Sequence, residues 1–329
     1  MNGKVKRYLA DICYLSGATA VAKWLNRGRK KVLTFHNVMP DNLAQKLPAN
    51  PVCISESYFR AIIRSLRRHY KFSTDVDDPK TLTITFDDGY CNQFEVAARV
   101  LQEEGGIPAI LFAAGKALRS AGPHEALAVD RLCYWHAFAS DNALRQLTPL
   151  VDRARAWNEC VFPAFSADVA TRGESYFAKC DALYSFDKIA SGFDPEYNRL
   201  RFSGIAEDRL DELRARGWTI GWHTETHFPL VSLSEAEIRK ELTPPEKMKG
   251  LPTSFPYGHE TQVGETAVKV ARELGYPIAY SNYMDACALT GRWFVPRLAQ
   301  YESATISSLE FELSGMKNLL KNGRLLAKV

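Results

Sequence analysis

Short apolar runs alternate with helix-patterned segments along most of the chain. The runs begin near residues 32, 82, 109, 218, 252, 277 and 293. The segment at 59–66 has its apolar residues three and four positions apart, the spacing of a helix with one buried face. The run at 82–86 is rich in β-branched residues without strict alternation, which suits a strand covered on both faces. Strands alternating with helices predict an α/β protein with a parallel sheet of seven strands.

The alternation stops between about residues 116 and 203. This stretch is polar, has mostly helical periodicity and contains many aromatic residues. A loop of that length without secondary structure is uncommon in a compact domain. We therefore expect a helical insertion, in which most of the aromatic side chains pack on one another and some stack on a ligand. The barrel-forming domain then spans 32–299.

Both ends of the chain are predicted to be amphipathic and basic helices. Residues 1–31 have the outline of a secretory signal, but Asp11 interrupts the apolar part and five basic residues crowd its far end. We therefore predict a retained N-terminal amphipathic helix. A second helix is expected over 304–328, within a C-terminal segment 300–329, and it carries Lys317, Lys321, Arg324 and Lys328.

Composition narrows the class of protein only moderately. The chain has 329 residues, of which 46% are hydrophobic and 24% charged, and these are ordinary globular values. The net charge of +4 gives no reason to expect a nucleic-acid partner. Seven scattered cysteines without a Cys-x-x-Cys pair favour reduced thiols in a cytoplasmic protein over a disulfide framework or a zinc finger.

Two acidic residues, Asp87 and Asp88, directly follow the apolar run at 82–86. A simple Asp-Gly turn after a strand would explain them as well as a functional site would. A second motif, His-Thr-Glu-Thr-His at 223–227, makes the functional interpretation stronger. If the turn is helical, two histidines four apart share one face of it. Together with one carboxylate they leave open coordination positions, as in catalytic zinc sites, and Co²⁺, Mn²⁺, Ni²⁺ or Fe²⁺ would also fit.

His36, Tyr257 and Arg297 also lie just after predicted strands. The carboxyl ends of barrel strands form one rim, so residues distant in sequence would converge there.

The pair of motifs resembles the polysaccharide deacetylase family, carbohydrate esterase family 4, on the residues Thr-Phe-Asp-Asp-Gly-Tyr at 85–90 and the histidine motif at 223–227. The resemblance implies a distorted (β/α)7 barrel with the helical insertion on its catalytic rim. It also implies a divalent metal, usually zinc, and hydrolysis of N- or O-acyl groups on sugars. Carried over residue by residue, it makes Asp88, His223 and His227 the metal ligands and Asp87 the general base. The resemblance implies as well that the Tyr257 position supplies a backbone N–H to the oxyanion.

The chain departs from the common pattern of that family in two places. No histidine occurs from Glu260 onward, so the usual late Leu-x-x-His acid is missing. His36 is the best replacement, because Val-Leu-Thr-Phe-His-Asn-Val at 32–38 resembles a subgroup of poly-N-acetylglucosamine deacetylases with a histidine on the first strand. His259 and His136 remain alternatives. The usual arginine before Pro-Tyr-Gly is also missing, and Arg297 is expected to reach Asp87 instead.

These features predict a metal-dependent hydrolase that removes an N-acetyl group from an amino sugar in a bacterial-type polysaccharide, glycan or lipid-linked precursor. Water activated by the metal would attack, with Asp87 as base and His36 as acid. The alternatives are a deformylase or O-deacetylase on a lipid-linked sugar, and an inactive carbohydrate-binding barrel.

A cytoplasmic location is expected, either free or peripheral at the inner face of the membrane. In the peripheral case, the two basic terminal helices would form one patch against anionic lipids. Otherwise they would be outer helices packed on the barrel with solvated lysines.

Overall fold

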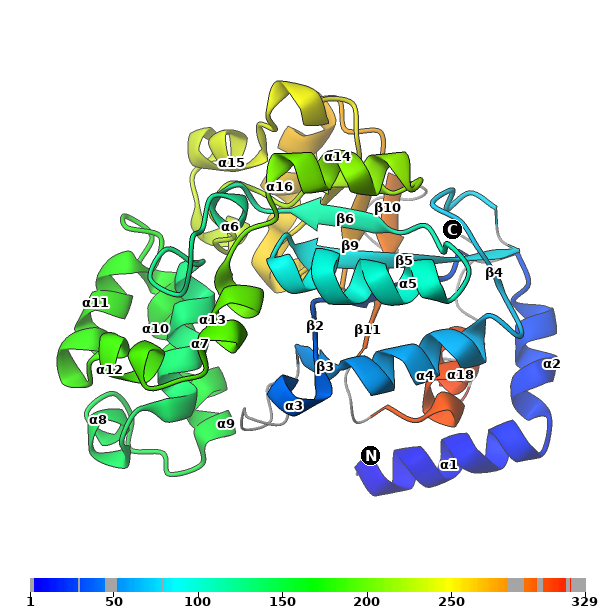
Figure 1. Cartoon of the computed structure of the whole chain (residues 1–329), viewed down its shortest axis with the longest axis horizontal. Coiled ribbons are helices and arrows are strands. Elements are labelled where there is room, and N and C mark those ends of the chain that lie inside the picture. The colour runs from blue at the N-terminus through cyan, green and yellow to red at the C-terminus, as the bar shows by residue number, and fades with distance from the viewer. Residues whose placement is uncertain are drawn as a thin grey trace.

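The computed structural model describes residues 3–28, 30–44, 52–78, 80–282, 293–300, 304–317 and 320. Its centre is a barrel-shaped parallel sheet with helices around it (Figure 1). The strands on the path of this sheet are β1 (Val32–Phe35), β5 (Thr81–Asp88), β6 (Ile110–Ala113), β7 (Thr219–Trp222), β8 (Thr253–Ser254), β9 (Ala279–Ser281), β10 (Phe294–Pro296) and β11 (Leu298–Ala299). A short strand, β4 (Lys71–Phe72), pairs with β5, while β2 (Asn37–Met39) and β3 (Cys53–Ser55) pair with each other.

The sheet closes on itself through the last strand. Its order is β10-β9-β8-β7-β6-β5-β1-β11, and each neighbouring pair is parallel. Only Arg297 separates β10 from β11, and these two strands lie at opposite ends of the path. Counted as one interrupted strand, they make a ring of seven, which confirms the predicted (β/α)7 barrel.

Strand β5 lies at the centre of the sheet and is fully enclosed. All eight of its residues are buried, because β1 and β6 pair with its two edges and helices cover its outer face. Phe86 stacks on Trp218 and also contacts the rings of Phe35 and Phe59. This packing fixes the strand that ends in Asp87 and Asp88.

The outer helices begin and end close to where the apolar pattern predicts. Helix α4 (Glu56–Leu66) begins at Ser55, whose hydroxyl accepts a hydrogen bond from the Tyr58 amide. It buries the apolar residues of the 59–66 pattern. The other outer helices are α3 (Asp41–Ala44), a π-helical turn (Gln93–Ala98) that continues as α5 (Arg99–Glu103), α14 (Glu207–Ala215), α15 (Glu235–Leu242) and α16 (Glu260–Glu273), with short 3₁₀ turns at Leu230–Ser232 and Glu246–Met248.

The stretch between β6 and α14 is helical, as predicted. Its elements are α6 (Gly115–Leu118), α7 (Ala128–Phe138), α8 (Asp141–Arg145), α9 (Arg153–Ala156), a π-helical turn (Trp157–Val161), α10 (Phe162–Ala167), α11 (Glu174–Leu183), α12 (Phe186–Ser191) and α13 (Pro195–Phe202). Tyr134 contacts Phe138, Phe193 and Phe202, so many of the aromatic side chains form a core of their own. Strands β5 and β6 point toward this insertion (Figure 1).

The two ends of the chain pack together, but neither is a single helix. The N-terminal segment forms α1 (Gly3–Leu15) and α2 (Ala18–Leu25), because Gly17 adopts a left-handed conformation with φ of 80° between them. Helix α18 (Ile306–Leu313) ends before Gly315, which also has positive φ, so the predicted continuous helix over 304–328 is wrong. Lys321, Arg324 and Lys328 lie outside the described residues.

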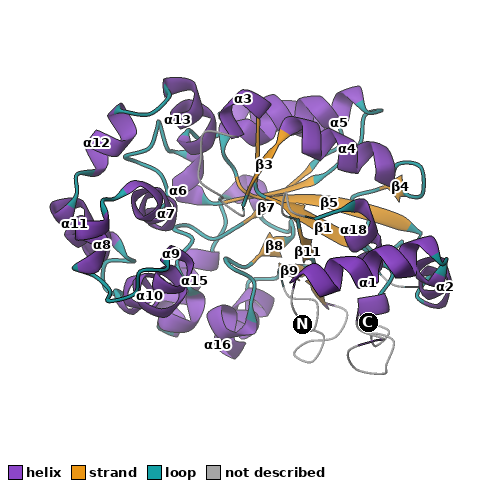
Figure 2. Cartoon of the chain, turned by 90° about the horizontal axis from the view of Figure 1, so that it is seen from below, coloured by secondary structure: helices purple, strands orange, loops and turns teal. Residues whose placement is uncertain are grey.

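Buried residues of these helices form a small cluster of their own, made of Ala10, Cys13, Ala22, Phe311 and Met316. Figure 2 shows α1, α2 and α18 together at the end of the molecule away from the insertion. None of the helices in the described ranges is long and apolar enough to cross a membrane.

Candidate active site

The candidate residues meet at the carboxyl ends of the barrel strands. Asp87 and Asp88 are the last residues of β5, and His223 directly follows β7. His36 directly follows β1, and Arg297 lies between β10 and β11. Side chains separated by up to 261 residues are thereby brought to one rim.

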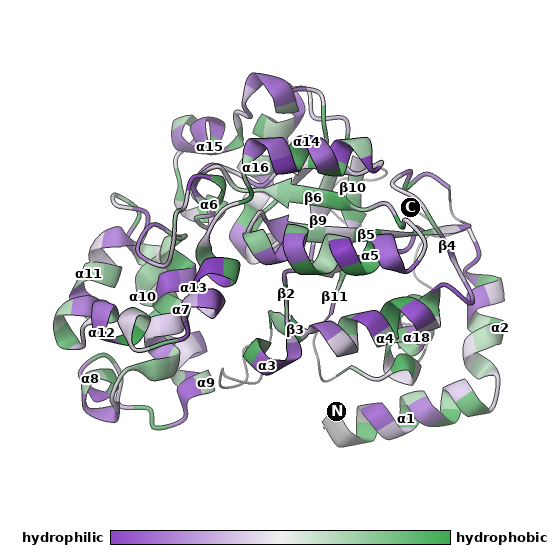
Figure 3. Cartoon of the chain, in the orientation of Figure 1, coloured by the Kyte–Doolittle hydropathy of each residue, from purple (hydrophilic) through white to green (hydrophobic). Residues whose placement is uncertain are grey.

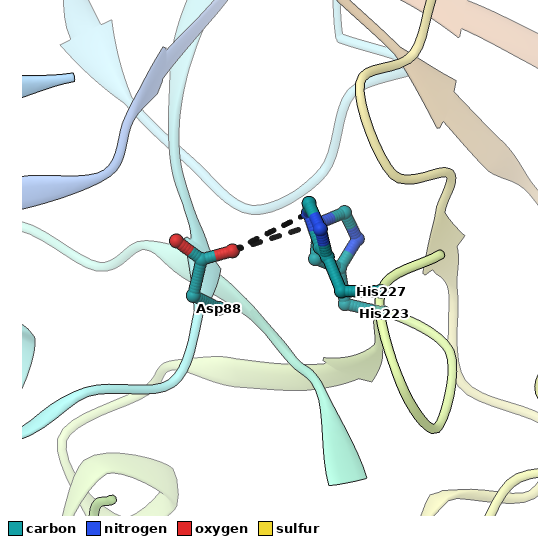
Figure 4. Close-up of side chains that lie close together, drawn as sticks. All are labelled: Asp88, His223 and His227. Atoms are coloured by element: carbon teal, nitrogen blue, oxygen red, sulfur yellow. Dashed lines mark ion pairs between the residues drawn. The ribbon is translucent and has the colours of Figure 1, made fainter. Parts of the chain in front are cut away.

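Asp88, His223 and His227 form a group that could hold one metal ion (Figure 4). Asp88 Oδ1 lies 3.6 Å from His227 Nε2 and 3.9 Å from His223 Nε2. In a tetrahedral zinc site with bonds of about 2.1 Å, neighbouring ligand atoms lie about 3.4 Å apart. His223 Nε2 is buried and has no hydrogen-bond partner among the described residues. A cation would satisfy this orphaned atom, so the donor set fits a catalytic metal.

The ring of His223 is held in the tautomer that leaves Nε2 for a metal. Its Nδ1 lies 2.9 Å from the backbone oxygen of Ser254, which can only accept a hydrogen bond, so Nδ1 carries the hydrogen. Burial lowers the pKa of His223 to about 3, and burial also lowers the pKa of His227. Both imidazoles are therefore neutral at ordinary pH, as metal binding requires.

The backbone is strained around the same group. Among the described residues other than glycine, five have positive φ, and four of these are Asp88, Thr224, His227 and Tyr257. Such conformations cost about 1–3 kcal/mol each and persist only where the surroundings enforce them. Their concentration here singles out this rim as the functional region of the barrel.

Glu241 enforces the conformation of the histidine loop. Its carboxylate accepts hydrogen bonds from the amides of Glu225 (3.0 Å) and Thr226 (2.8 Å) and from the Thr226 hydroxyl. Thr224 Oγ1 accepts a bond from the His227 amide. These bonds fix the turn between the two histidines before any ligand binds.

Asp87 is fully buried beside the triad and forms a two-point ion pair. Arg297 Nη1 donates to Oδ1 at 2.7 Å and Nη2 donates to Oδ2 at 2.6 Å, which confirms the expected contact from the last strand. Ser254 Oγ lies 3.3 Å from Oδ1. Burial alone would raise the pKa of Asp87, but Arg297 and the nearby histidines lower it well below its usual range. Asp87 is therefore an anion.

His36 lies on the other side of Asp87. Its Nε2 is 3.9 Å from Asp87 Oδ2, and its side chain is 17% exposed, so it reaches the solvent-facing side of the site. Of the other two histidines considered as acids, His259 caps α16 and His136 lies 2.9 Å from the Arg153 carbonyl oxygen in the insertion. Of these three histidines, His36 is the one that lies next to Asp87.

Tyr257 borders the triad through its ring and backbone. Its ring centroid lies 4.9 Å from that of His227 and 5.1 Å from that of Phe162 in the insertion. Its amide donates no hydrogen bond to any residue in the described part of the chain. The insertion therefore reaches the edge of the site, and a backbone donor is available there.

Three supporting contacts were not foreseen from the sequence. Ser254 orients His223 and touches Asp87. Gln93 donates to the carbonyl oxygens of His36 and Asp87. These contacts join segments that share no motif, so no local pattern predicts them.

The third is a buried group that connects the insertion to the site. Asp130 accepts hydrogen bonds from Tyr90 (2.6 Å) and Arg201 (2.7 Å), and both Asp130 and Arg201 are buried. Burial and the charge of Asp130 raise the pKa of Asp88 to about 7. A cation bound to Asp88 would oppose both effects and hold that carboxylate ionised.

The fold resembles that of solved deacetylases. The Streptococcus pyogenes deacetylase PplD, in complex with acetate, aligns with a TM-score of 0.52 and 12% identity over 85% of this chain and 96% of that one. A de-N-acetylase from Aggregatibacter actinomycetemcomitans aligns with a TM-score of 0.48 and 14% identity, covering 85% and 98%. IcaB from Ammonifex degensii gives 0.46 and 17%, covering 87% and 97%.

At such identities the similarity to the S. pyogenes protein establishes a shared fold. No protein-family model and no curated protein sequence matches the chain.

Proposed function

We propose that this protein is a metal-dependent hydrolase that removes an N-acetyl group from an amino sugar in a polysaccharide, glycan or lipid-linked precursor. The observation that carries the proposal is the buried triad of Asp88, His223 and His227 with the anionic Asp87 beside it. An imidazole nitrogen that is buried without a hydrogen-bond partner, next to two carboxylates, destabilises the fold. Such an atom is therefore unexpected at a rim that has only a structural role.

The triad would hold a divalent ion, for which Zn²⁺ is the best candidate and Co²⁺, Ni²⁺, Mn²⁺ or Fe²⁺ are alternatives. When bound, such an ion makes water more acidic and polarises an acyl oxygen. The protein's own part is to keep both histidines neutral and to fix the tautomer of His223 through Ser254.

Asp87 is the proposed general base. Its nearest oxygen lies 3.8 Å from His223 Nε2, so it borders the position that a reacting water would occupy. Arg297 keeps it ionised and holds it in one orientation through two parallel hydrogen bonds. A base held in this way can take a proton without first having to move.

His36 is the proposed general acid, and Tyr257 the proposed oxyanion donor. His36 is close enough to Asp87 to share the same substrate, and its partial exposure lets it recover a proton from solvent. The free amide of Tyr257 lies in the strained turn beside His227, where a backbone donor would stabilise negative charge on the acyl oxygen.

For the acyl group of the substrate, the proposal of an acetyl group has the most support. The S. pyogenes deacetylase of similar fold is described in complex with acetate, the product of deacetylation. None of the six cysteines in the described residues forms a disulfide bond, which is compatible with the reducing, cytoplasmic setting that we propose. We place the enzyme there, with an acylated carbohydrate as its substrate.

Release of acid from a panel of acylated amino sugars tests the proposal. Acetate and formate should be measured separately, with N-acetyl, N-formyl and O-acetyl substrates, before and after chelation and re-addition of Zn²⁺. We expect acetate from N-acetyl sugars, loss of release after chelation, and recovery with metal. Formate alone, or acetate from O-acetyl sugars alone, would change the substrate class. Release that survives complete removal of metal would refute the proposed chemistry.

A further inference from the structure

Exposed apolar side chains concentrate on the two N-terminal helices. Of the eleven large apolar side chains that are exposed in the described part of the chain, eight lie on α1 and α2. We use the term N-terminal face for six of them: Tyr8, Ile12, Leu15, Val21, Trp24 and Leu25. Leu15 is 84% exposed and Trp24 is 62% exposed. An exposed apolar patch on this scale marks an interaction site more often than a random surface.

Helix α1 is apolar on two opposite sides. Ala10 and Cys13 face inward, where they pack with α18, while Tyr8, Ile12 and Leu15 lie outward at four- and three-residue spacing. A helix that only packs on a barrel would carry polar residues on its outer side. Figure 3 shows apolar segments interspersed along α1. Packing within this chain accounts for one side and leaves the other unexplained.

The charges around the N-terminal face are strongly one-sided. Residues 1–31 contain eight lysines and arginines and a single acidic residue, Asp11, which is hydrogen-bonded to Ser307. Lys23 and Lys30 are neutralised by Glu310 and Asp77.

The two arginines next to the face are not neutralised in this way. Arg7 is exposed and forms no ion pair with the described residues, and the Arg27 guanidinium lies 4.6 Å from the centre of the Trp24 ring. The face therefore combines interfacial aromatic residues with uncompensated positive charge.

We propose that the N-terminal face binds the surface of a membrane that contains anionic lipids. Tryptophan and tyrosine favour the boundary between headgroups and acyl chains. Short amphipathic helices with basic flanks lie in that plane and bind more tightly as apolar area and anionic charge increase. A protein partner or a second copy of this chain would need a complementary acidic and apolar surface, whereas an anionic bilayer supplies both features.

The position of the face bears on how such an enzyme would work. Helices α1 and α2 lie at the end of the molecule away from the insertion, and β5 and β6 point toward the insertion (Figures 1 and 2). Membrane contact through this face would hold the enzyme at the bilayer while its catalytic rim stays uncovered. The contact thus deepens the proposed function by confining it to sugars made or carried near the membrane.

Co-sedimentation with vesicles tests the contact on the full-length protein. We expect the protein to pellet with vesicles of phosphatidylcholine mixed with phosphatidylglycerol at low salt. It should remain in the supernatant with phosphatidylcholine alone, and high salt should weaken the binding. A protein that stays in the supernatant with anionic vesicles at low salt would overturn the proposal.

Two variants and one matched control sharpen the experiment. Leu15→Gln with Trp24→Gln should reduce vesicle binding at least tenfold, because two inserted apolar side chains are lost. Arg7→Gln with Arg27→Gln should weaken it about fivefold for each charge removed. Val151→Gln, which replaces an 85% exposed apolar residue in the insertion, should bind like the wild type. Equal binding by all of these proteins would show that the N-terminal face is not the contact.

Two further measurements separate this proposal from its competitors. Hydrolysis of a small soluble acylated sugar without vesicles should be the same in wild type and in Leu15→Gln with Trp24→Gln, since neither residue lies at the rim. Loss of vesicle binding and loss of hydrolysis are then measured separately, so the membrane contact and the proposed hydrolase activity can each fail without the other. Light scattering should show no change of oligomeric state. A wild-type dimer that the double variant dissociates, without vesicle binding, would assign the face to self-association and refute the membrane contact.

Discussion

The rim of the barrel and the N-terminal face place side chains in opposite and equally unusual environments. At the rim, charged residues such as Asp87 and Arg297 are completely buried. On the N-terminal face, large apolar residues such as Leu15 and Trp24 are exposed. Apolar exposure and charged burial are the departures from ordinary partitioning that carry information about function.

The two regions also differ in how firmly they are held. At the rim, Asp87 is held by two hydrogen bonds from Arg297, and the strained backbone of the histidine loop is kept in place by bonds to Glu241 and Thr224. On the N-terminal face, the outer side chains of α1 are exposed, and the helix is held from its inner side by a small cluster of five buried residues that joins the chain's ends. A preorganised site suits catalysis, because small displacements of reacting groups are costly. An apolar face without fixed geometry suits a lipid bilayer, which is fluid.

The largest expected effect comes from breaking the rim at a proposed metal ligand. His227→Ala removes one of the three proposed ligands, so we expect loss of bound metal and of all measurable turnover, as judged by elemental analysis and acid release. His259→Ala is the matched control, because His259 caps α16 and is not one of the three proposed ligands, and it should cost about 1 kcal/mol of stability while keeping the metal. Full metal occupancy in His227→Ala would show that the triad is not the metal site.

Next in size is the loss of the proposed acid. His36→Ala leaves the triad and the Asp87–Arg297 pair intact, so metal content should be unchanged. Turnover should fall by about 10²–10⁴-fold, the usual contribution of a general acid. If His36→Ala turns over like the wild type, the acid must be sought elsewhere, first at His259 and His136.

The buried Asp130–Arg201 pair, which connects the insertion to the rim, should contribute to the free energy of unfolding. Asp130→Asn would leave the buried Arg201 without its counter-charge, which we expect to cost about 3–5 kcal/mol in denaturant unfolding. Asp141→Asn breaks an exposed pair with Arg153 in the same insertion and should cost about 0–1 kcal/mol. Equal costs in the two variants would mean that the buried pair does not stabilise this region.

The smallest effect is expected on the exposed side of the N-terminal helices. Leu15→Gln should change the free energy of unfolding by less than about 0.5 kcal/mol, because the side chain has little to lose in the isolated protein. Phe311→Ala, in the buried cluster on the inner side, should cost about 3–5 kcal/mol. A large loss of unfolding free energy in Leu15→Gln would show that the N-terminal face is covered in solution and not exposed.

The sequence was most informative where chemistry depends on short motifs. Asp87, Asp88, His223 and His227 lie in two local motifs at strand ends, and the order of strands then brings them together. Arg297 was harder, because it has no motif, yet its place at the last strand end was enough to predict its reach to Asp87.

The features that were not predicted from the sequence depend mostly on long-range packing. The Asp130–Arg201 pair joins residues 71 apart that only the folded insertion brings into contact. The role of Ser254 was not predicted, because it depends on the fold bringing His223 and Asp87 beside it. The break at Gly17 was overlooked because the apolar pattern continues across it, whereas the backbone conformation does not.

The proposed roles of the triad and of Asp87 are best tested together, by determining metal content and acetate release on the same samples of wild type and Asp87→Asn after loading with Zn²⁺. Retained metal in the variant also reports that the rim has folded despite the loss of the Arg297 partner. The account predicts one bound ion in both proteins and a loss of turnover in Asp87→Asn of about 10²–10⁴-fold or more. Wild-type turnover in Asp87→Asn with the metal in place would contradict it.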